Sequence, residues 1–197
     1  MLYTGLLSYA KKLQQFYITN YKAKRKPCSL PDPADSLSSP AAPLIIPHDT
    51  TYAMLTSGFY HIFLKFVSPF LYDLCQMYFK QFRRLIPTNG DAMLKELKDF
   101  LHSSNPNADR ILRAYLVYYL LENFFATYED YSFYKNISIG IMHTHLLELF
   151  LALYYKKNLS LTEDEIIQII TVCTRRGQHN DTIEAAMYEK LNSCLIS

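Results

Sequence analysis

The hydrophobic positions of this chain recur with helical spacing, and they predict helices along most of its length. From residue 2 to residue 21, leucines and aromatic residues fit one face of a short amphipathic helix. No run alternates hydrophobic and polar residues as a half-buried strand would, and the Asn89-Gly90 pair lies between helical patterns. The sequence therefore predicts an all-α protein, an irregular helical bundle with an N-terminal amphipathic helix.

Three helical patterns make up the first part of the body. Residues 52–85 are dense in leucine and phenylalanine, with a kink or a break expected at Ser68-Pro69. Residues 91–101 carry one apolar stripe and predict a half-exposed helix, with these charged residues largely off the stripe: Lys95, Glu96, Lys98 and Asp99. Asn105-Pro106 opens the next pattern, which runs toward Ala126. Because its apolar arc is wide, we expect this third helix to be central.

Residues 137–155 form a nearly continuous apolar segment with two possible interpretations. A membrane span needs about 20 apolar residues, and this segment approaches that length. Three ionisable side chains near its middle, those of His143, His145 and Glu148, make insertion into a bilayer costly. We therefore expect a buried helix of the bundle and no membrane span.

His145 and Glu148 share one face of this segment, whereas His143 points to another face. One face thus offers two possible metal ligands, and a metal site in a helical bundle needs further carboxylates or histidines. Buried polar groups nearly always find hydrogen-bond partners. The pair therefore predicts a buried hydrogen bond that fixes one helix against another, in preference to a metal site.

A well-marked helix begins after residue 162. Thr162 and Glu165 have the spacing of a capping box, in which the hydroxyl accepts from the backbone of residue 165 and the carboxylate accepts from the backbone of residue 162. An apolar stripe then runs from Ile166 to Cys173. Gly177 can take the left-handed conformation that closes a helix.

Cationic residues gather where this helix ends: Arg175, Arg176 and His179. The backbone carbonyls and the helix dipole stabilise cations at such an end, which is one sufficient explanation for them. The functional alternative is a site for an anion or a carboxylate, because arginine offers a planar two-pronged donor and histidine titrates near neutral pH. The residues by themselves leave both interpretations open.

Composition and charge restrict the possible partners. The net charge of +2 is too small to indicate nucleic-acid binding, which usually needs a strongly basic face. The four cysteines lie far apart with no CxxC pair, which argues against a zinc knuckle or a redox motif. The apolar N-terminus has neither a basic region before it nor a cleavage pattern after it, so we expect reduced thiols and a cytoplasmic protein.

Proline and serine divide the chain. Six of the nine prolines fall between Pro27 and Pro47, in a stretch that also contains several serines and cannot continue a helix. This pattern predicts three parts. Residues 1–26 form a basic amphipathic helix, residues 27–50 a Pro/Ser-rich linker, and residues 51–197 a helical domain.

Three motifs in the helical domain occur in a recognisable order. An aromatic helix, Leu112-Arg113-Ala114-Tyr115-Leu116-Val117-Tyr118-Tyr119, precedes the long apolar segment. A helix start follows at Leu161-Thr162-Glu163-Asp164, and the close reads Thr174-Arg175-Arg176-Gly177-Gln178-His179-Asn180. With this order and spacing, residues 111–191 resemble the C-terminal part of the bacterial flagellin lysine-N-methylase family.

The resemblance implies an activity, a cofactor and a partner. Members of this family transfer methyl groups from S-adenosylmethionine to lysine side chains of flagellin in the bacterial cytoplasm. On the matching motif, Arg175 and Arg176 become candidates for binding substrate or an anion, and His179 becomes the candidate catalytic residue. His179 would orient the substrate lysine or take its proton, because an ammonium must lose a proton before it can attack a methyl sulfonium.

The family also implies an N-terminal cysteine-rich module suited to a metal or iron–sulfur centre. This chain has no such cluster, since Cys28 stands alone in its N-terminal part. We therefore expect a truncated or C-terminal fragment that acts with a separate cysteine-rich module, and no metal or iron–sulfur centre in the chain itself. The alternative function is a non-enzymatic helical adaptor whose aromatic grooves hold a partner helix.

Overall fold

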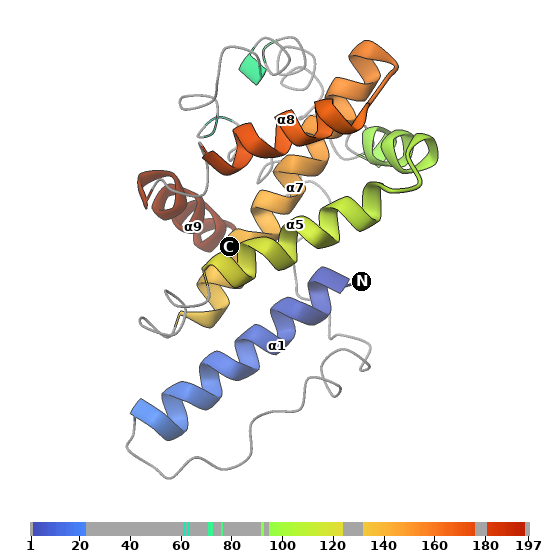
Figure 1. Ribbon diagram of the computed structural model, residues 1–197. Helices are drawn as coiled ribbons and strands as arrows, with labels where there is room; N and C mark the ends of the chain where they lie inside the picture. Colours follow the sequence, from blue (N-terminus) through green and yellow to red (C-terminus); the bar gives the residue numbers. More distant parts are fainter. Residues whose placement is uncertain are drawn as a thin grey trace. The chain divides into compact units, whose positions relative to one another are not determined.

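The computed structural model describes residues 2–22, 61, 63, 71, 72, 76, 92, 95–123, 132–175 and 181–195. Every regular element in these ranges is a helix, so the predicted all-α fold is confirmed (Figure 1). Residues 95–104 are helical, and the other elements are α1 (Leu2–Phe16) with a π-helical turn (Tyr17–Lys22), α5 (Ala108–Glu122), α7 (Phe133–Asn158), α8 (Glu163–Cys173) and α9 (Asp181–Leu195). The expected linker at 27–50, the break at Ser68-Pro69 and the helix-closing Gly177 lie outside the described residues.

The chain divides into two compact units. Unit 1 consists of Met1–Ile45 and Leu116–Met142, and unit 2 consists of Ile46–Tyr115 and His143–Ser197. The division falls inside α5 and inside α7, so each of these helices contributes to both units. The sequence-based boundaries at residues 26 and 50 rest on composition, and they stay a prediction.

The core of unit 1 joins α1 to parts of α5 and α7. Leu7 of α1, Leu116 of α5 and Ile141 of α7 are buried together, and these partly buried residues pack around them: Leu6, Leu120, Tyr134 and Ile137. The face of α1 predicted to be apolar is therefore the face that is buried. Its two lysines, Lys11 and Lys12, are exposed.

Gly140 allows α5 to approach α7 closely in unit 1. A Cβ atom at this position would lie 2.6 Å from Cδ1 of Tyr119, a residue that is only 1% exposed. The ring therefore has little room to move, and the contact requires a residue without a side chain.

We expect Gly140→Ala to destabilise the protein although alanine favours helices. The gain in helix propensity is about 1 kcal/mol, whereas overpacking a rigid core costs about 1–3 kcal/mol and more for so short a contact. A net loss of roughly 1–2 kcal/mol should appear in urea unfolding followed by circular dichroism. A matched change on an exposed helix surface, Ser103→Ala, should leave the unfolding midpoint nearly unchanged. A more stable Gly140→Ala protein would contradict this packing.

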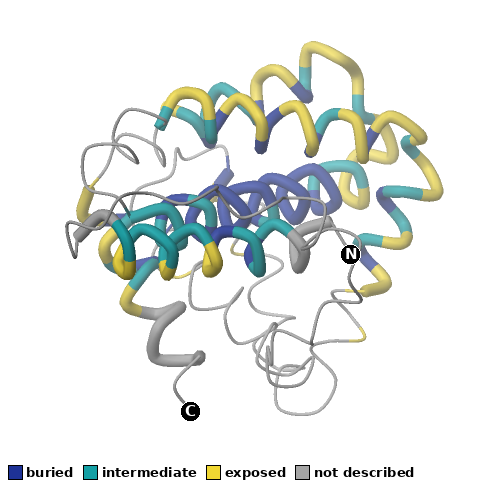
Figure 2. Tube along the Cα trace, turned by 90° about the horizontal axis from the view of Figure 1, so that it is seen from below, coloured by how far each residue is buried: buried dark blue, intermediate teal, exposed yellow. Residues whose placement is uncertain are grey.

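Unit 2 is organised around the second part of α7. The largest side chains with almost no exposure come from several elements of this unit: Phe63, Leu71, Leu97, Leu101, Leu147, Phe150, Ile169 and Ile183. Phe63 and Phe150 pack at a ring-centroid distance of 5.5 Å. Residues 95–104 also contact α7 through Phe100 and Tyr155, whose centroids lie 5.2 Å apart. The buried positions of α7 appear as a nearly unbroken dark segment in Figure 2.

Burial explains the apolar sequence of α7. Among the described residues it is the helix long and apolar enough to pass a length-and-composition test for a membrane span, with a mean hydropathy of 1.4 in its most apolar window. In this structure 83% of that window is buried inside the protein. The helix is also longer than the predicted segment 137–155, and it ends where Leu159 adopts a positive φ of 56°.

The start of α8 is built as the sequence predicts. The Thr162 hydroxyl accepts from the Glu165 backbone N–H at 3.4 Å, and the Glu165 carboxylate accepts from the Thr162 N–H at 2.7 Å. The Tyr154 hydroxyl of α7 donates to the other Glu165 oxygen at 2.9 Å. The cap therefore also ties α8 to α7. On the apolar stripe, Ile166, Ile169 and Cys173 are buried.

Loss of this cap should be measurable. We expect Thr162→Ala to lower the free energy of unfolding by about 1 kcal/mol, because the Glu165 backbone N–H loses its acceptor and the Glu165 carboxylate loses the hydroxyl that donates to it. Thr162→Ser keeps the hydroxyl oxygen and should retain most of the stability. Equal midpoints for the alanine and serine variants in urea unfolding would show that the cap adds nothing.

The third helical pattern of the body corresponds to α5. This helix is less buried than its wide apolar arc predicts. Tyr115 and Tyr119 are buried, but Val117 is 56% exposed and Leu121 is 69% exposed. The helix starts at Ala108, because the Asn105 carbonyl and side chain bind the N–H groups of Ala108 and Asn107. Pro106 was expected in the first turn of this helix, but it lies in the turn before it.

Candidate functional site

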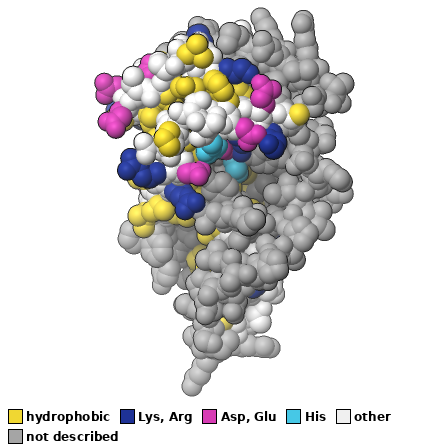
Figure 3. Space-filling model, turned by 90° about the vertical axis from the view of Figure 1, so that its right-hand side faces the viewer, with side chains coloured by type: hydrophobic (Ala, Val, Ile, Leu, Met, Phe, Trp, Pro, Cys, Tyr) yellow, Lys and Arg dark blue, Asp and Glu magenta, His cyan; other side chains and the backbone are white. Residues whose placement is uncertain are grey.

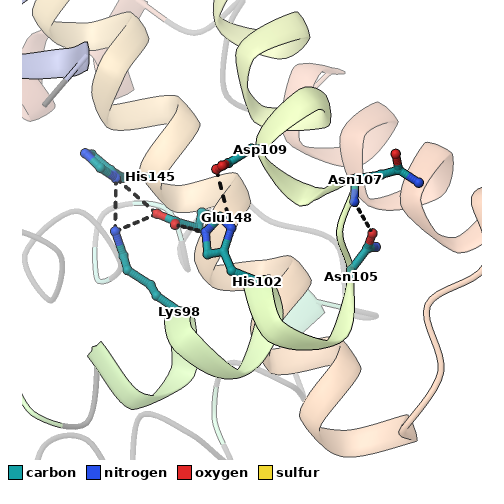
Figure 4. Close-up of polar contacts among 7 residues, drawn as sticks. All are labelled: Lys98, His102, Asn105, Asn107, Asp109, His145 and Glu148. Carbon is teal, nitrogen blue, oxygen red and sulfur yellow. Dashed lines mark hydrogen bonds and ion pairs between the residues drawn. The ribbon is translucent and has the colours of Figure 1, made fainter.

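A buried carboxylate, that of Glu148, contacts polar side chains from two segments of unit 2, residues 95–104 and α7 itself. Glu148 lies on α7 with 8% of its side chain exposed. Its Oε2 atom lies 2.5 Å from Nζ of Lys98 and 3.2 Å from Nδ1 of His145. Its Oε1 atom lies 2.9 Å from Nε2 of His102 (Figure 4). We call these four side chains, Lys98, His102, His145 and Glu148, the Glu148 cluster.

His102 extends this cluster toward the surface. Its Nδ1 atom lies 3.4 Å from Oδ1 of Asp109 at the start of α5, and the Asp109 side chain is 72% exposed. The turn between these two residues is fixed by the Asn105 side chain, which accepts from the backbone of Asn107 at 3.0 Å. The His102 side chain is itself 34% exposed. Figure 3 accordingly shows imidazole rings at the surface among acidic and basic side chains.

The charges in the Glu148 cluster follow from burial and from the neighbouring groups. Burial by itself raises the pKa of Glu148, but the hydrogen bond from His145, the positive charge of Lys98 and the contact with His102 outweigh it and lower the pKa to about 2. Burial lowers the pKa of His145, an effect that Glu148 opposes and the charge of Lys98 reinforces. At neutral pH the cluster thus holds an ionised Glu148 and a neutral His145.

The Nδ1 atom of the neutral His145 ring forms a hydrogen bond with only one of its two neighbours at a time. Its Nδ1 atom lies 3.3 Å from Nζ of Lys98 as well as 3.2 Å from Glu148. With a proton it donates to the carboxylate, and without one it accepts from the ammonium. Such a ring is a weaker base than an exposed imidazole, because burial disfavours its charged form and lowers its pKa.

The chemistry of the cluster is therefore that of a structural ion pair. The Lys98 ammonium already contacts the carboxylate, and no group of three or more His, Cys, Asp or Glu side chains within the described ranges is placed to hold a metal ion. The contacts join residues 95–104 to α7. The predicted hydrogen bond between His145 and Glu148 is present, but it lies within α7, and the contacts of Glu148 with Lys98 and His102 fix one helix against another.

His143 lies on another face of α7, as its spacing predicts. The side chain is 2% exposed, and its ring packs edge-on against Phe63 with a centroid distance of 6.5 Å. Burial lowers the pKa of His143 to about 4. His143 is therefore neutral at physiological pH and forms part of the core.

The predicted cationic end of α8 is described in part. Thr174 caps the helix in a right-handed conformation, and its N–H donates to carbonyls of the last turn, those of Ile170 and Thr171. Arg175 follows and is exposed. Arg176 and His179 lie outside the described residues, so the structure does not bring the three candidate residues together or separate them.

A comparison with protein families assigns the chain. The family model of the FliB lysine N-methylase C-terminal domain matches residues 49–195. The chain belongs to this family. No curated protein and no solved structure gives a match.

The FliB C-terminal domain includes nearly all of unit 2. The Glu148 cluster, the helix α8 and the cationic residues at its end all lie within the matched residues, whereas α1 precedes them. The resemblance seen in residues 111–191 is thus confirmed, and the matched region begins further upstream. This extension covers the predicted helices of residues 52–101.

Two members of the Glu148 cluster, Lys98 and His102, escaped the sequence analysis. Lys98 was expected largely off the apolar stripe, but its side chain is 24% exposed and points to Glu148. Lys98 and His102 are four residues apart and so share a helix face, as His145 and Glu148 do. The complementary charges of these two pairs were the only indication in the sequence that they form one cluster. Their spacing, however, does not show that the two helix faces contact each other.

Proposed function

We propose that this chain takes part in methylation of lysine side chains of flagellin, with S-adenosylmethionine as the methyl donor, in the bacterial cytoplasm. The observation that carries the proposal is the match of residues 49–195 to a domain of lysine N-methylases. In this reaction the lysine nitrogen forms a bond to the methyl carbon while the bond between that carbon and the sulfonium sulfur breaks. Besides flagellin, the family resemblance implies a second partner, a separate cysteine-rich module.

Within this proposal, the cationic end of α8 is the substrate site. Arg175 and Arg176 bind a carboxylate or another anion beside the target lysine, and His179 accepts the ammonium proton before attack. The exposure of Arg175 supports this role, because an exposed guanidinium is accessible to another protein. The Glu148 cluster is excluded from this role by its neutral, weakly basic His145 and by its own lysine.

The methyl donor does not fit the pocket that the described residues of unit 1 form. This pocket, of about 410 Å³, is lined by five residues of unit 1: Lys11, Lys12, Gln14, Gln15 and Tyr134. S-adenosylmethionine carries a sulfonium and an ammonium against a single carboxylate, so its net positive charge is repelled by two lysine side chains. Four of the five residues also precede the matched domain. No step of the reaction is therefore assigned to this pocket.

Mass spectrometry of flagellin tests the proposal directly. Flagellin from a strain with the gene should contain lysine-bearing peptides heavier by one or more methyl groups, and a strain without the gene should lack them. Restoring the gene with His179→Ala or Arg175→Ala should fail to restore the modification, whereas Lys157→Ala, which removes an exposed cation from α7, should restore it. Unchanged lysine masses in the strain without the gene would refute the methylase function.

A further inference from the structure

The outer face of α5 is apolar and largely open to solvent. Val117, Tyr118 and Leu121 are 56%, 45% and 69% exposed, and Ala114, one turn earlier, is exposed as well. Three of the seven large hydrophobic side chains that the described residues expose thus lie within five consecutive positions of one helix. Single exposed hydrophobic residues are ordinary in soluble proteins, whereas a contiguous group of them marks a contact surface.

The opposite face of α5 is already buried in the protein. The side chains on that face are each at most 4% exposed: Leu112, Tyr115, Leu116 and Tyr119. Because α5 is unbroken from Ala108 to Glu122 (Figure 1), helical spacing alone fixes which residues share its outer face. A helix that is apolar on both faces is normally covered on both. The outer face is therefore built to contact something beyond the described part of the chain.

Charged side chains of opposite sign border the two ends of this outer face. Arg110 and Arg113 are exposed near the start of α5, and Glu122 is exposed at its end. The Tyr118 hydroxyl forms a hydrogen bond with the Glu122 carboxylate, which holds the negative charge beside the apolar residues. The remaining charged residue of the helix, Asp109, contacts the Glu148 cluster instead. The outer face is thus basic at one end, apolar in the middle and acidic at the other end.

We propose that the outer face of α5 docks against the same face of a second copy of this chain, with the two helices antiparallel around a two-fold axis. An antiparallel pair places the basic end of each helix beside the acidic end of the other, whereas a parallel pair brings like charges together. With the axis midway between Val117 and Tyr118, Leu121 lies opposite the partner's Ala114, so a large side chain faces a small one. One surface then serves both copies, as a two-fold interface requires.

The small area of this surface sets the strength of the contact. A standard interface buries about 800 Å² of each partner, and one face of a 15-residue helix offers less than that. We therefore expect a weak, reversible dimer with a dissociation constant on the order of tens of micromolar. An unrelated helix could cover the apolar middle, but this chain itself carries the complementary pattern of charge.

The test is the oligomeric state of the full chain in solution. Sedimentation velocity over roughly 1–500 µM protein should show a shift from monomer to dimer as the concentration rises. Leu121→Lys should raise the dissociation constant by about tenfold or more, because it replaces a central apolar contact by a charge that faces the partner's basic end. The matched control is Ile167→Lys, which makes the same kind of change at a 59% exposed position of α8 and should leave dimer formation unchanged.

Charge exchange tests the antiparallel arrangement. Glu122→Arg should weaken the dimer, because both ends of the outer face are then basic. Adding Arg110→Glu and Arg113→Glu to the same chain exchanges the two ends and should restore the dimer. All these positions are exposed, so circular dichroism should show the same helix content in each variant as in the parent protein.

Three outcomes would overturn the proposal. A chain that stays monomeric over the whole concentration range would leave the outer face of α5 to a different protein. Equal losses for Leu121→Lys and Ile167→Lys would mean that the dimer does not form through α5. A triple charge variant that remains as weak as Glu122→Arg would exclude the antiparallel pairing. Sedimentation involves neither flagellin nor a methyl donor, so this proposal and the proposed methylation fail separately.

Discussion

Glu148→Ala is expected to lower the free energy of unfolding by about 3–5 kcal/mol, a large effect for a single substitution. The carboxylate lies at the centre of contacts with Lys98, His102 and His145, and only 8% of its side chain is exposed. Without it, the Lys98 ammonium, whose side chain is only 24% exposed, loses its counter-ion. An unpaired charge in such a place is far less stable than the same charge in water.

Urea unfolding monitored by circular dichroism measures this loss. The matched control is Asp99→Ala, which breaks the ion pair between Lys95 and Asp99 on the exposed side of residues 95–104. Both side chains of that pair are more than half exposed, so its removal should shift the midpoint little. Comparable shifts for the two alanine variants would mean that Glu148 does not act as a buried ion-pair partner.

The double variant Lys98→Met with Glu148→Leu tests whether Glu148→Ala is destabilising because it leaves the Lys98 charge unpaired or because the ion pair itself is lost. Replacing both members of a buried ion pair by apolar residues of similar volume is often neutral or stabilising. We therefore expect the double variant to recover most of the stability that Glu148→Ala loses. A double variant as unstable as the sum of its single variants would instead show that the two side chains act independently.

Acid is expected to unfold this protein in two overlapping stages. The pKa of His143 falls from the usual 6.5 to about 4 in the folded state. Below pH 6.5 the unfolded state therefore binds a proton at this position, and the folded state does not until about pH 4. The free energy of unfolding should fall by about 3 kcal/mol over this interval. The lowered pKa of His145 acts in the same direction.

Glu148 supplies the second stage. Its pKa is lowered from 4.5 to about 2, so the stability it contributes is fully present above pH 4.5 and is lost as the pH falls toward 2. This adds about 3 kcal/mol to the loss. Since a domain of this size is stable by about 5–15 kcal/mol, much of that stability should be gone near pH 3.

Urea unfolding at several pH values between 7.5 and roughly 4 tests the first stage. In His143→Leu the dependence on pH should become shallower by the contribution of one histidine, whatever the absolute stability of the variant. Ser103→Ala changes an exposed residue without a titratable group and should leave the slope unchanged. A slope in His143→Leu equal to that of the parent protein would show that residue 143 does not titrate as its burial requires.

Local patterns are the part of the fold that could be predicted well. The capping box of Thr162 and Glu165, the stripe from Ile166 to Cys173 and the apolar face of α1 depend on spacing within one helix. Such spacing determines which side chains share a face, and a face with enough apolar residues must be buried against something. The family motifs are likewise local, which is why the amino-acid sequence is enough to recognise the resemblance.

The candidate site was predictable only in part. A buried hydrogen bond between His145 and Glu148 was predicted from their spacing on one helix, and it is present within a larger network. Its partners, Lys98 and His102, lie more than forty residues earlier in the chain. The residues near Lys98 and His102 in the sequence are charged, so both were expected at the surface. Helical periodicity predicts which side chains share a face, but it does not predict what that face packs against.

By itself, then, the sequence determined the all-α fold, the cap that begins α8, the buried faces of α1 and α8, and the family. Tertiary structure alone decided that Lys98 contacts a buried carboxylate, that Gly140 receives the ring of Tyr119, and that Val117 and Leu121 of α5 remain exposed. The physical reason is the range of the interactions. Propensity, capping and periodicity act within a few residues, whereas burial and pKa values depend on which distant surfaces pack together.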